Sequence, residues 1–160
     1  ILSSPKQRGA TTMFDSSTLY DQSTFYRAFE RDLLSAQQEV IIESPFITEK
    51  RMNVLLPIFI KMRRRNVRII VNTRNPDEHE GDYYYQALDA VAAMQDLGII
   101  VLYTAGHHRK LAIIDRRIAY EGSLNILSFS DSCEIMRKMV SEQIAGRLLK
   151  FINIDRCMKE

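Results

Sequence analysis

Residues 106–134 read GHHRKLAIIDRRIAYEGSLNILSFSDSCE, and the rest of the chain is organised around this stretch. Near its start, His108 and Lys110 are separated by one residue and lead into an apolar run. Because side chains alternate along an extended segment, these two point to the same side and place a titratable nucleophile or base beside a positive charge. Asp115 ends the apolar run and has the opposite parity. We therefore expect Asp115 to face away from the pair and to have a structural role.

A second polar group follows the apolar run at Gly122, Ser123 and Asn125. A glycine permits a tight bend and a close approach of two backbones, while Ser123 and Asn125 share parity. Two strands would thus deliver an imidazole, an ammonium, a hydroxyl and an amide to one small site. Such a site is suited to handling phosphate.

The whole pattern resembles the signature of the phospholipase D superfamily, H-x-K-x4-D-x6-G-S-x-N. Its fixed positions are filled with the correct spacing by His108, Lys110, Asp115, Gly122, Ser123 and Asn125. A match at every fixed position of so long a signature is specific. The resemblance implies that the chain cleaves or transfers phosphodiesters without a metal or other cofactor, through a phosphohistidine intermediate.

The resemblance also assigns roles. His108 is the expected nucleophile, and Lys110 is the cation for the non-bridging phosphoryl oxygens, where charge builds in the transition state. Ser123 and Asn125 would add uncharged donors to the same oxygens. Glu134 follows Asn125 at a distance where the family often has a carboxylate, and we expect it to hydrogen-bond the histidine and fix its tautomer.

The sequence contains two other histidines, His79 and His107. His107 lies on the opposite side from Lys110 by parity, so we expect a structural or loop role for it. His79 belongs to an acidic loop, residues 77–82, that has no partner cluster with metal-ligand spacing, and we expect this loop to be solvated. Neither histidine begins a second H-x-K motif.

Three consecutive tyrosines, Tyr83 to Tyr85, offer a further hint. Aromatic rings can stack on nucleobases. Neighbouring residues fan out around a helix, however, so we expect one or two of these rings to pack beneath the sheet.

Composition bounds the class of protein. The chain has 160 residues, of which 46% are hydrophobic, and this suits one domain. Its net charge of +2 permits a nucleic-acid partner without demanding one. Cys133 and Cys157 form no C-x-x-C pair, which indicates a reducing, cytoplasmic setting. Apolar runs are too short to span a membrane.

Hydrophobic periodicity predicts an α/β sandwich in which helices flank a mixed central sheet. This arrangement resembles the phospholipase D fold. We expect an N-terminal arm or linker at residues 1–23 and a catalytic domain at residues 24–160. The expected helices cover residues 24–37, 49–65, 83–97 and 142–153, and the expected strands cover residues 40–42, 67–72, 99–103, 110–115, 118–122 and 135–140.

Three functions fit these observations. The favoured one is a metal-independent nuclease that cleaves DNA, or RNA as the less favoured nucleic acid. The segments 41–47 and 121–125 resemble those of phospholipase D domains in longer, bacterial helicase-like proteins, which favours nucleic acid as the substrate. The alternatives are a phospholipase D or phosphatidyl transferase acting on lipid, and a non-catalytic nucleic-acid-binding domain.

Two-motif relatives use a second histidine to protonate the leaving oxygen. With a single motif, we expect a homodimer with a composite active site. The alternatives are that His79 serves within one chain or that the second half comes from another domain of a longer protein.

Overall fold

The structure, a computed structural model, describes residues 17–154. Seven strands form one sheet in the order β1-β7-β6-β5-β2-β3-β4. The strands β2, β3 and β4 are parallel, and the remaining pairs are antiparallel. In chain order the elements are β1 (Ser17–Tyr20), α1 (Phe25–Ser35), β2 (Glu39–Glu43), α2 (Glu49–Arg64), β3 (Arg68–Thr73), η1 (Pro76–Glu78), α3 (Asp82–Asp96), β4 (Ile100–Tyr103), β5 (Leu111–Ile114), β6 (Ile118–Gly122), β7 (Met136–Val140) and α4 (Glu142–Ile152). The predicted fold class, a mixed sheet flanked by helices, is confirmed.

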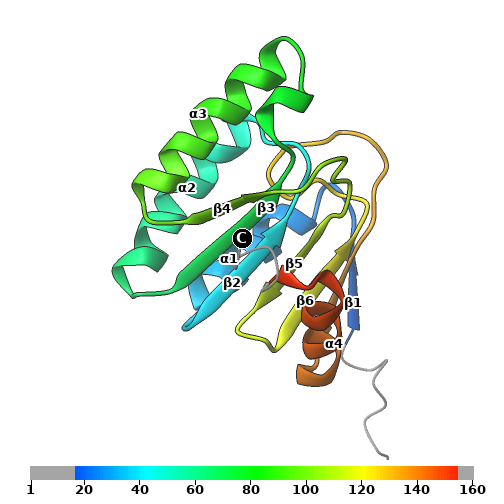
Figure 1. The fold of residues 1–160 in the computed structure, drawn as a ribbon. Helices are drawn as coiled ribbons and strands as arrows, with labels where there is room; N and C mark the ends of the chain where they lie inside the picture. The colour runs from blue at the N-terminus through cyan, green and yellow to red at the C-terminus, as the bar shows by residue number, and fades with distance from the viewer. Residues whose placement is uncertain (1–16, 155–160) are drawn as a thin grey trace, which may run out of the picture.

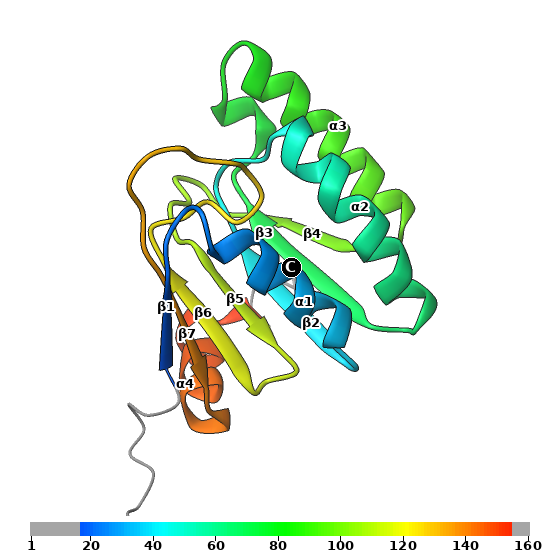
Figure 2. The same cartoon turned by 180° about the vertical axis from the view of Figure 1, so that it is seen from behind.

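Alternation along the buried strands divides the core into two layers. On β2, Val40 and Ile42 join the larger cluster with α1, α2 and α3, whereas Ile41 joins a smaller cluster with α4. Figures 1 and 2 show α4 on one face of the sheet and α1 to α3 on the other. The α4 face is therefore the less covered of the two.

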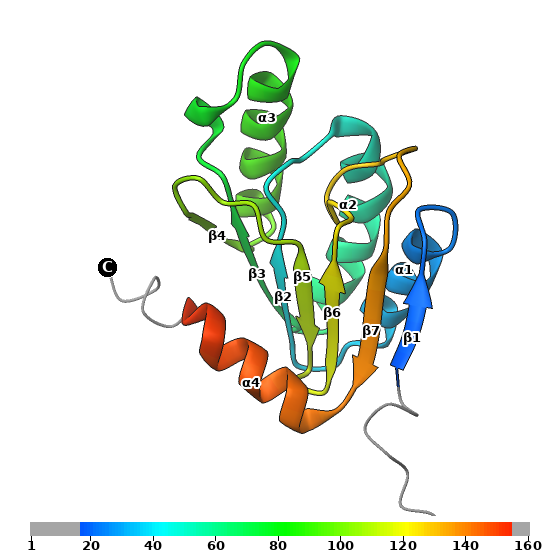
Figure 3. The same ribbon diagram turned by 90° about the vertical axis from the view of Figure 1, so that its right-hand side faces the viewer.

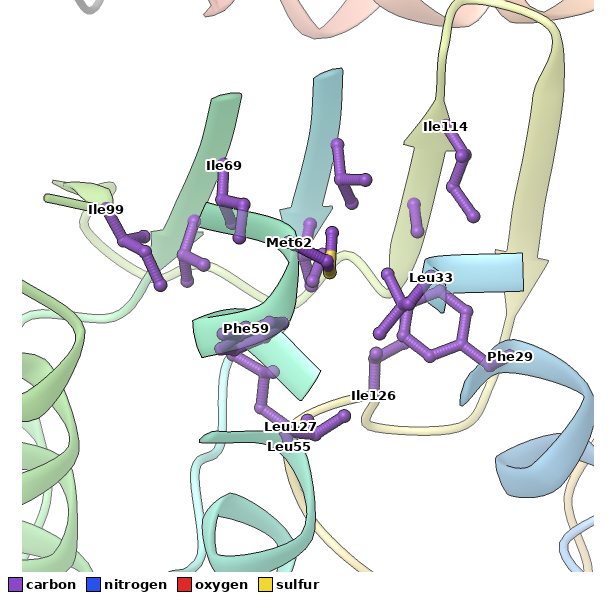
Figure 4. Packing of buried hydrophobic residues seen from close by; sticks show 14 of the residues in the cluster. Phe29, Leu33, Leu55, Phe59, Met62, Ile69, Ile99, Ile114, Ile126 and Leu127 are labelled. Carbon is purple, nitrogen blue, oxygen red and sulfur yellow. The ribbon is translucent and has the colours of Figure 1, made fainter. Parts of the chain in front are cut away.

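The segment that follows the motif is anchored in the larger layer. Ile126 and Leu127 are fully buried. Figure 4 shows them among side chains that α1 and α2 contribute, including Phe29 and Leu55. The connection between β6 and β7 is thus held by the core at its start.

The first strand was missed by the sequence analysis. Residues 1–16 of the predicted arm lie outside the described part of the chain, but Ser17–Tyr20 forms β1 and pairs antiparallel with β7. The strand is short and largely polar, with Leu19 exposed. Its position depends on main-chain pairing at a sheet edge, which leaves no apolar run in the sequence. The sheet therefore begins before residue 24.

Asp115 closes the turn between β5 and β6. It and Arg116 have φ of 53° and 52°, the left-handed region that tight hairpin turns use. The Asp115 carboxylate accepts hydrogen bonds from the backbone amides of Gln37, Gln38 and Glu39, at 3.0, 2.8 and 3.0 Å. It thereby ties the hairpin to the start of β2, far from the predicted catalytic pair.

We predict that Asp115→Asn lowers the free energy of unfolding by about 1–3 kcal/mol at neutral pH, because an amide replaces the charged acceptor. Burial raises the pKa of Asp115, but the three backbone amides outweigh it, so the pKa lies below its usual value. A depressed pKa stabilises the fold above the unfolded-state pKa of about 4, and this stability is lost as the pH falls through the folded-state pKa. Urea denaturation at neutral and acidic pH measures both effects.

The matched control is Asp89→Asn, an exposed aspartate on α3, which should change stability by less than about 0.5 kcal/mol. Equal losses for Asp115→Asn and Asp89→Asn would contradict the structural role of Asp115.

Candidate active site

One cavity of about 890 Å³ gathers the predicted catalytic residues. It lies where β5 begins and β6 ends, and Figure 3 shows the β2–α2 and β6–β7 connections at this same end of the sheet. Its lining includes His108, Lys110, Ser123, Asn125 and Glu134. Residues separated by up to 26 positions in sequence thus share one space.

His108 and Lys110 lie together, although not on a strand. The strand β5 begins at Leu111, one residue later than predicted, and both residues precede it. The Lys110 Nζ is 3.0 Å from His108 Nδ1 and 3.3 Å from Nε2, and it donates to the His108 carbonyl oxygen at 2.7 Å. Since an ammonium only donates, Lys110 can hydrogen-bond only a ring nitrogen of His108 that carries no proton.

The electrostatics around Lys110 depend on its neighbours. Partial burial is the main cause that lowers the pKa of Lys110, and Arg74 lowers it further. Glu134 opposes both by raising it. The Glu134 carboxylate therefore lies close enough to favour the charged form of the lysine.

Gly122 and Ser123 fasten β6 to the start of β7. A methyl group at Gly122 would lie 2.2 Å from the Ile135 carbonyl oxygen, so no larger residue fits. The Ser123 hydroxyl accepts from the Ile135 amide at 3.0 Å and donates to its carbonyl at 3.3 Å. Ser123 therefore holds the backbone here, and its hydroxyl proton makes the longer of the two bonds.

Glu134 does not make the hydrogen bond expected of it. Its Oε1 accepts from the Ser132 hydroxyl at 2.9 Å, and within residues 17–154 the His108 ring bonds to Lys110 and not to Glu134. Hydrogen bonds inside the loop hold the carboxylate away from the ring. The predicted Glu134–His108 contact is thus wrong for this conformation, although both residues line the cavity.

His107 is fully engaged in a buried network that sequence reasoning missed. Its Nε2 is 2.7 Å from Oε2 of Glu43, and its Nδ1 accepts from the Arg109 amide at 3.1 Å. The ring is therefore neutral, with its proton on Nε2. Asn72 and the Arg109 guanidinium also donate to Glu43 Oε2, at 3.2 and 3.1 Å. His107 is buried and has no free ring nitrogen for chemistry.

Ser44, the residue after Glu43, holds the segment that follows the second half of the motif, Gly122 to Asn125. The buried Ser44 hydroxyl accepts from the Leu127 amide at 3.2 Å, and the Thr48 amide donates to the Leu127 carbonyl at 3.0 Å. Two adjacent residues at the end of β2 thus fix both segments that carry the cavity residues. The signal in the sequence is a carboxylate directly after the apolar residues 40–42, the predicted strand, and Glu43 is in fact the last residue of β2.

Two further expectations from the sequence concern metal ligands and membrane-spanning segments. Residues 17–154 contain no group of three or more His, Cys, Asp or Glu side chains placed to hold a metal ion, the acidic loop included. In the same range, no helix is both long and apolar enough to cross a membrane.

The mixed sheet and its cavity define a domain of the phospholipase D superfamily. The chain belongs to the family described as "Cardiolipin synthase, PLD-like domain", whose family model matches residues 29–155. A search of curated proteins finds no match.

Solved structures share the fold at low sequence identity. NucT from Helicobacter pylori is 14% identical, with a TM-score of 0.70 over 89% of this chain and 95% of that one. The phospholipase D family member Nuc from Salmonella typhimurium is 16% identical, with a TM-score of 0.67 over 85% and 90%. The phosphatidylserine synthase of Haemophilus influenzae is 12% identical, with a TM-score of 0.66 over 86% of this chain and 38% of that one. At such identities the likeness concerns the fold alone.

We predict that Glu43→Gln lowers the free energy of unfolding by about 1–3 kcal/mol, because it leaves charged and neutral donors around a weaker acceptor. Combining it with Arg109→Gln should cost less than the sum of the single variants, since each removes the same contact. Thermal and urea denaturation of the four proteins measure this coupling.

Glu39→Gln, the same substitution at the other end of β2, serves as the control. Glu39 forms ion pairs with two exposed arginines, Arg116 at 3.3 Å and Arg68 at 3.7 Å, so its loss should change stability by less than about 1 kcal/mol. Strict additivity of Glu43→Gln and Arg109→Gln would show that their contact does not stabilise the fold.

Proposed function

We propose that this phospholipase D-like domain is a metal-independent nuclease that cleaves DNA in preference to RNA through a phosphohistidine at His108. The observation that carries the proposal is the shared cavity, in which a lysine-bound imidazole lies with a hydroxyl, an amide and a carboxylate. Arg109 and Arg137 line the same cavity and supply further positive charge for a polyanion.

The chemistry follows from these groups. A ring nitrogen of His108 attacks the phosphorus, a phosphorus–nitrogen bond forms, and the bond to the leaving oxygen breaks. Lys110 and Asn125 neutralise the non-bridging oxygens, and Ser123 can turn its proton from the Ile135 carbonyl to the same oxygens. Glu134 stabilises the cations of the cavity. Attack by water then releases the phosphoryl group and restores His108.

The leaving oxygen needs a proton, and the chain offers one H-x-K motif. We infer that a second copy supplies its own His108 across a two-fold axis and later takes a proton from the attacking water. Exposed apolar side chains at the cavity, Ile135 at 51% and Phe151 at 74%, support such a covered interface. The less covered sheet face beside α4 adjoins them.

Nucleic acid is favoured over lipid by the cationic lining and by the resemblance of residues 41–47 to phospholipase D domains of helicase-like proteins. A longer helicase-like parent and a cytoplasmic setting remain predictions. Phosphatidyl transfer is the second candidate, since the family's description names a lipid enzyme and apolar side chains line part of the cavity. A non-catalytic binding domain would have no need of the paired His108 and Lys110.

We predict that the protein cleaves labelled DNA in the presence of EDTA, because Lys110 supplies the cation that a metal would otherwise provide. Single- and double-stranded DNA, RNA and phosphatidylcholine are compared in one assay. His108→Ala should lower the rate by roughly a thousandfold or more, which separates true turnover from a contaminant. Activity that requires magnesium or manganese would contradict the mechanism, and exclusive turnover of phosphatidylcholine would contradict the substrate.

We predict that active sites require two intact histidines. When wild-type and His108→Ala chains are co-expressed and mix at random, activity should fall as the square of the wild-type fraction. A linear fall would mean that each chain works alone. Phe151→Glu at the cavity should weaken the dimer in sedimentation, whereas Leu34→Glu, an exposed residue on α1, should leave it intact.

A further inference from the structure

A second cavity, of about 420 Å³, adjoins the first through a shared residue. Asn125 lines both cavities. The second cavity is otherwise lined by Phe46, Tyr83, Ser128, Phe129, Ser130 and Asp131. A substrate strand that passes Asn125 therefore continues from the reacting phosphate into an aromatic space.

The aromatic rings of this space come from separate segments. Phe46, in the β2–α2 connection, lies edge-on to Tyr83 of α3 with their centroids 5.7 Å apart. His79 lies 5.3 Å from Phe46 and supports this wall. Tyr83 is 50% exposed and Tyr85 is 66% exposed, whereas Tyr84, between them, is half-buried.

Phe129 supplies another ring, from the β6–β7 connection. The Tyr26 ring lies 4.9 Å from it, and the buried Arg51 guanidinium lies 5.2 Å from its centroid. Arg51 is itself fixed, because it donates to the Ile126 carbonyl at 3.0 Å and to Glu30 at 2.6 Å. Phe129 is thus held in place before any ligand arrives.

The charges around this cavity select the kind of group that enters it. Its polar lining consists of an amide, two hydroxyls and the Asp131 carboxylate, which repels a phosphate but can accept hydrogen bonds from a base edge. The cations lie against the rings: Arg74 is 5.3 Å from the Phe46 centroid, and Lys50 is 5.6 Å from that of Phe129. A neutral planar group therefore suits the cavity. The phosphate backbone of a bound strand would lie along the two cations, Arg74 and Lys50.

We propose that this cavity binds an unpaired nucleobase next to the scissile phosphodiester, by stacking on Tyr83, with Phe46 and Phe129 lining the space beside it. The inference rests on the proposed function, and it specifies single-stranded or locally opened nucleic acid as the substrate. A base within a duplex is already stacked on its neighbours, so the strand must present it unstacked. Hydrogen-bonding groups around the rings would then favour some bases over others.

The test measures binding without turnover, in the His108→Ala background. Fluorescence anisotropy compares a short single-stranded oligonucleotide with a strand of equal length and charge whose nucleotides are abasic. The base-carrying strand should bind roughly tenfold more tightly, as expected for one stacked base. Adding Tyr83→Ala should remove most of this difference, and Phe129→Leu should reduce it. Tyr85→Ala, an exposed tyrosine two residues further along α3, should preserve it.

Each outcome bears on the inference. Equal affinity for the two strands in the His108→Ala protein would overturn it, as would equal effects of Tyr83→Ala and Tyr85→Ala. Binding of anionic phospholipid vesicles that depends on Tyr83, without base-dependent binding of strands, would assign the cavity to a lipid instead. The proposed nuclease activity is tested separately by turnover, so loss of one result does not imply loss of the other.

Discussion

The site depends on a buried carboxylate at the end of β2. Glu43 is fully buried, and its Oε2 is contacted by His107, Asn72 and Arg109. Removing a carboxylate from water is costly unless donors contact it, so the 107–109 segment is held where His107 and Arg109 reach Oε2; the buried Oε1 has no partner among residues 17–154. Through the same strand end, Ser44 fixes the segment at Leu127. The two halves of the motif thus meet because they share one support.

The contacts of Glu43 explain why neighbouring residues of the segment 107–110 have different roles. His107 is buried against Glu43 Oε2, and the Arg109 guanidinium reaches the same oxygen while it lines the cavity with His108 and Lys110. Arg109 occupies the variable position x of the H-x-K motif, and in this chain its charge bonds the buried Glu43 carboxylate. Under the proposed function, a backbone held by buried contacts keeps the His108 imidazole in place while the ring itself stays exposed to substrate.

Much of this could be predicted from local sequence. Apolar periodicity predicted the four α-helices and six of the seven strands, but not the 3-10 helix η1. Motif spacing predicted His108, Lys110, Ser123 and Asn125 in the cavity, and the family resemblance added Glu134. Contacts distant in sequence could not be predicted. The burial of Glu43 depends on Asn72 and His107, and β1 depends on β7 for its pairing. Glu134 lines the cavity with the other predicted residues. Its hydrogen bond to Ser132 depends on the conformation of the β6–β7 connection, which hydrophobic periodicity does not predict.

The central claim is that His108 carries the phosphoryl group during turnover. Its most direct test is a rapid quench in base, where phosphohistidine survives, of the wild-type protein mixed with an oligonucleotide. Peptide mapping by mass spectrometry then locates any added phosphoryl group. The account predicts a transient adduct on His108 that is absent from His108→Ala. An adduct on Ser123 or His107, or steady turnover with no adduct at His108, would contradict it.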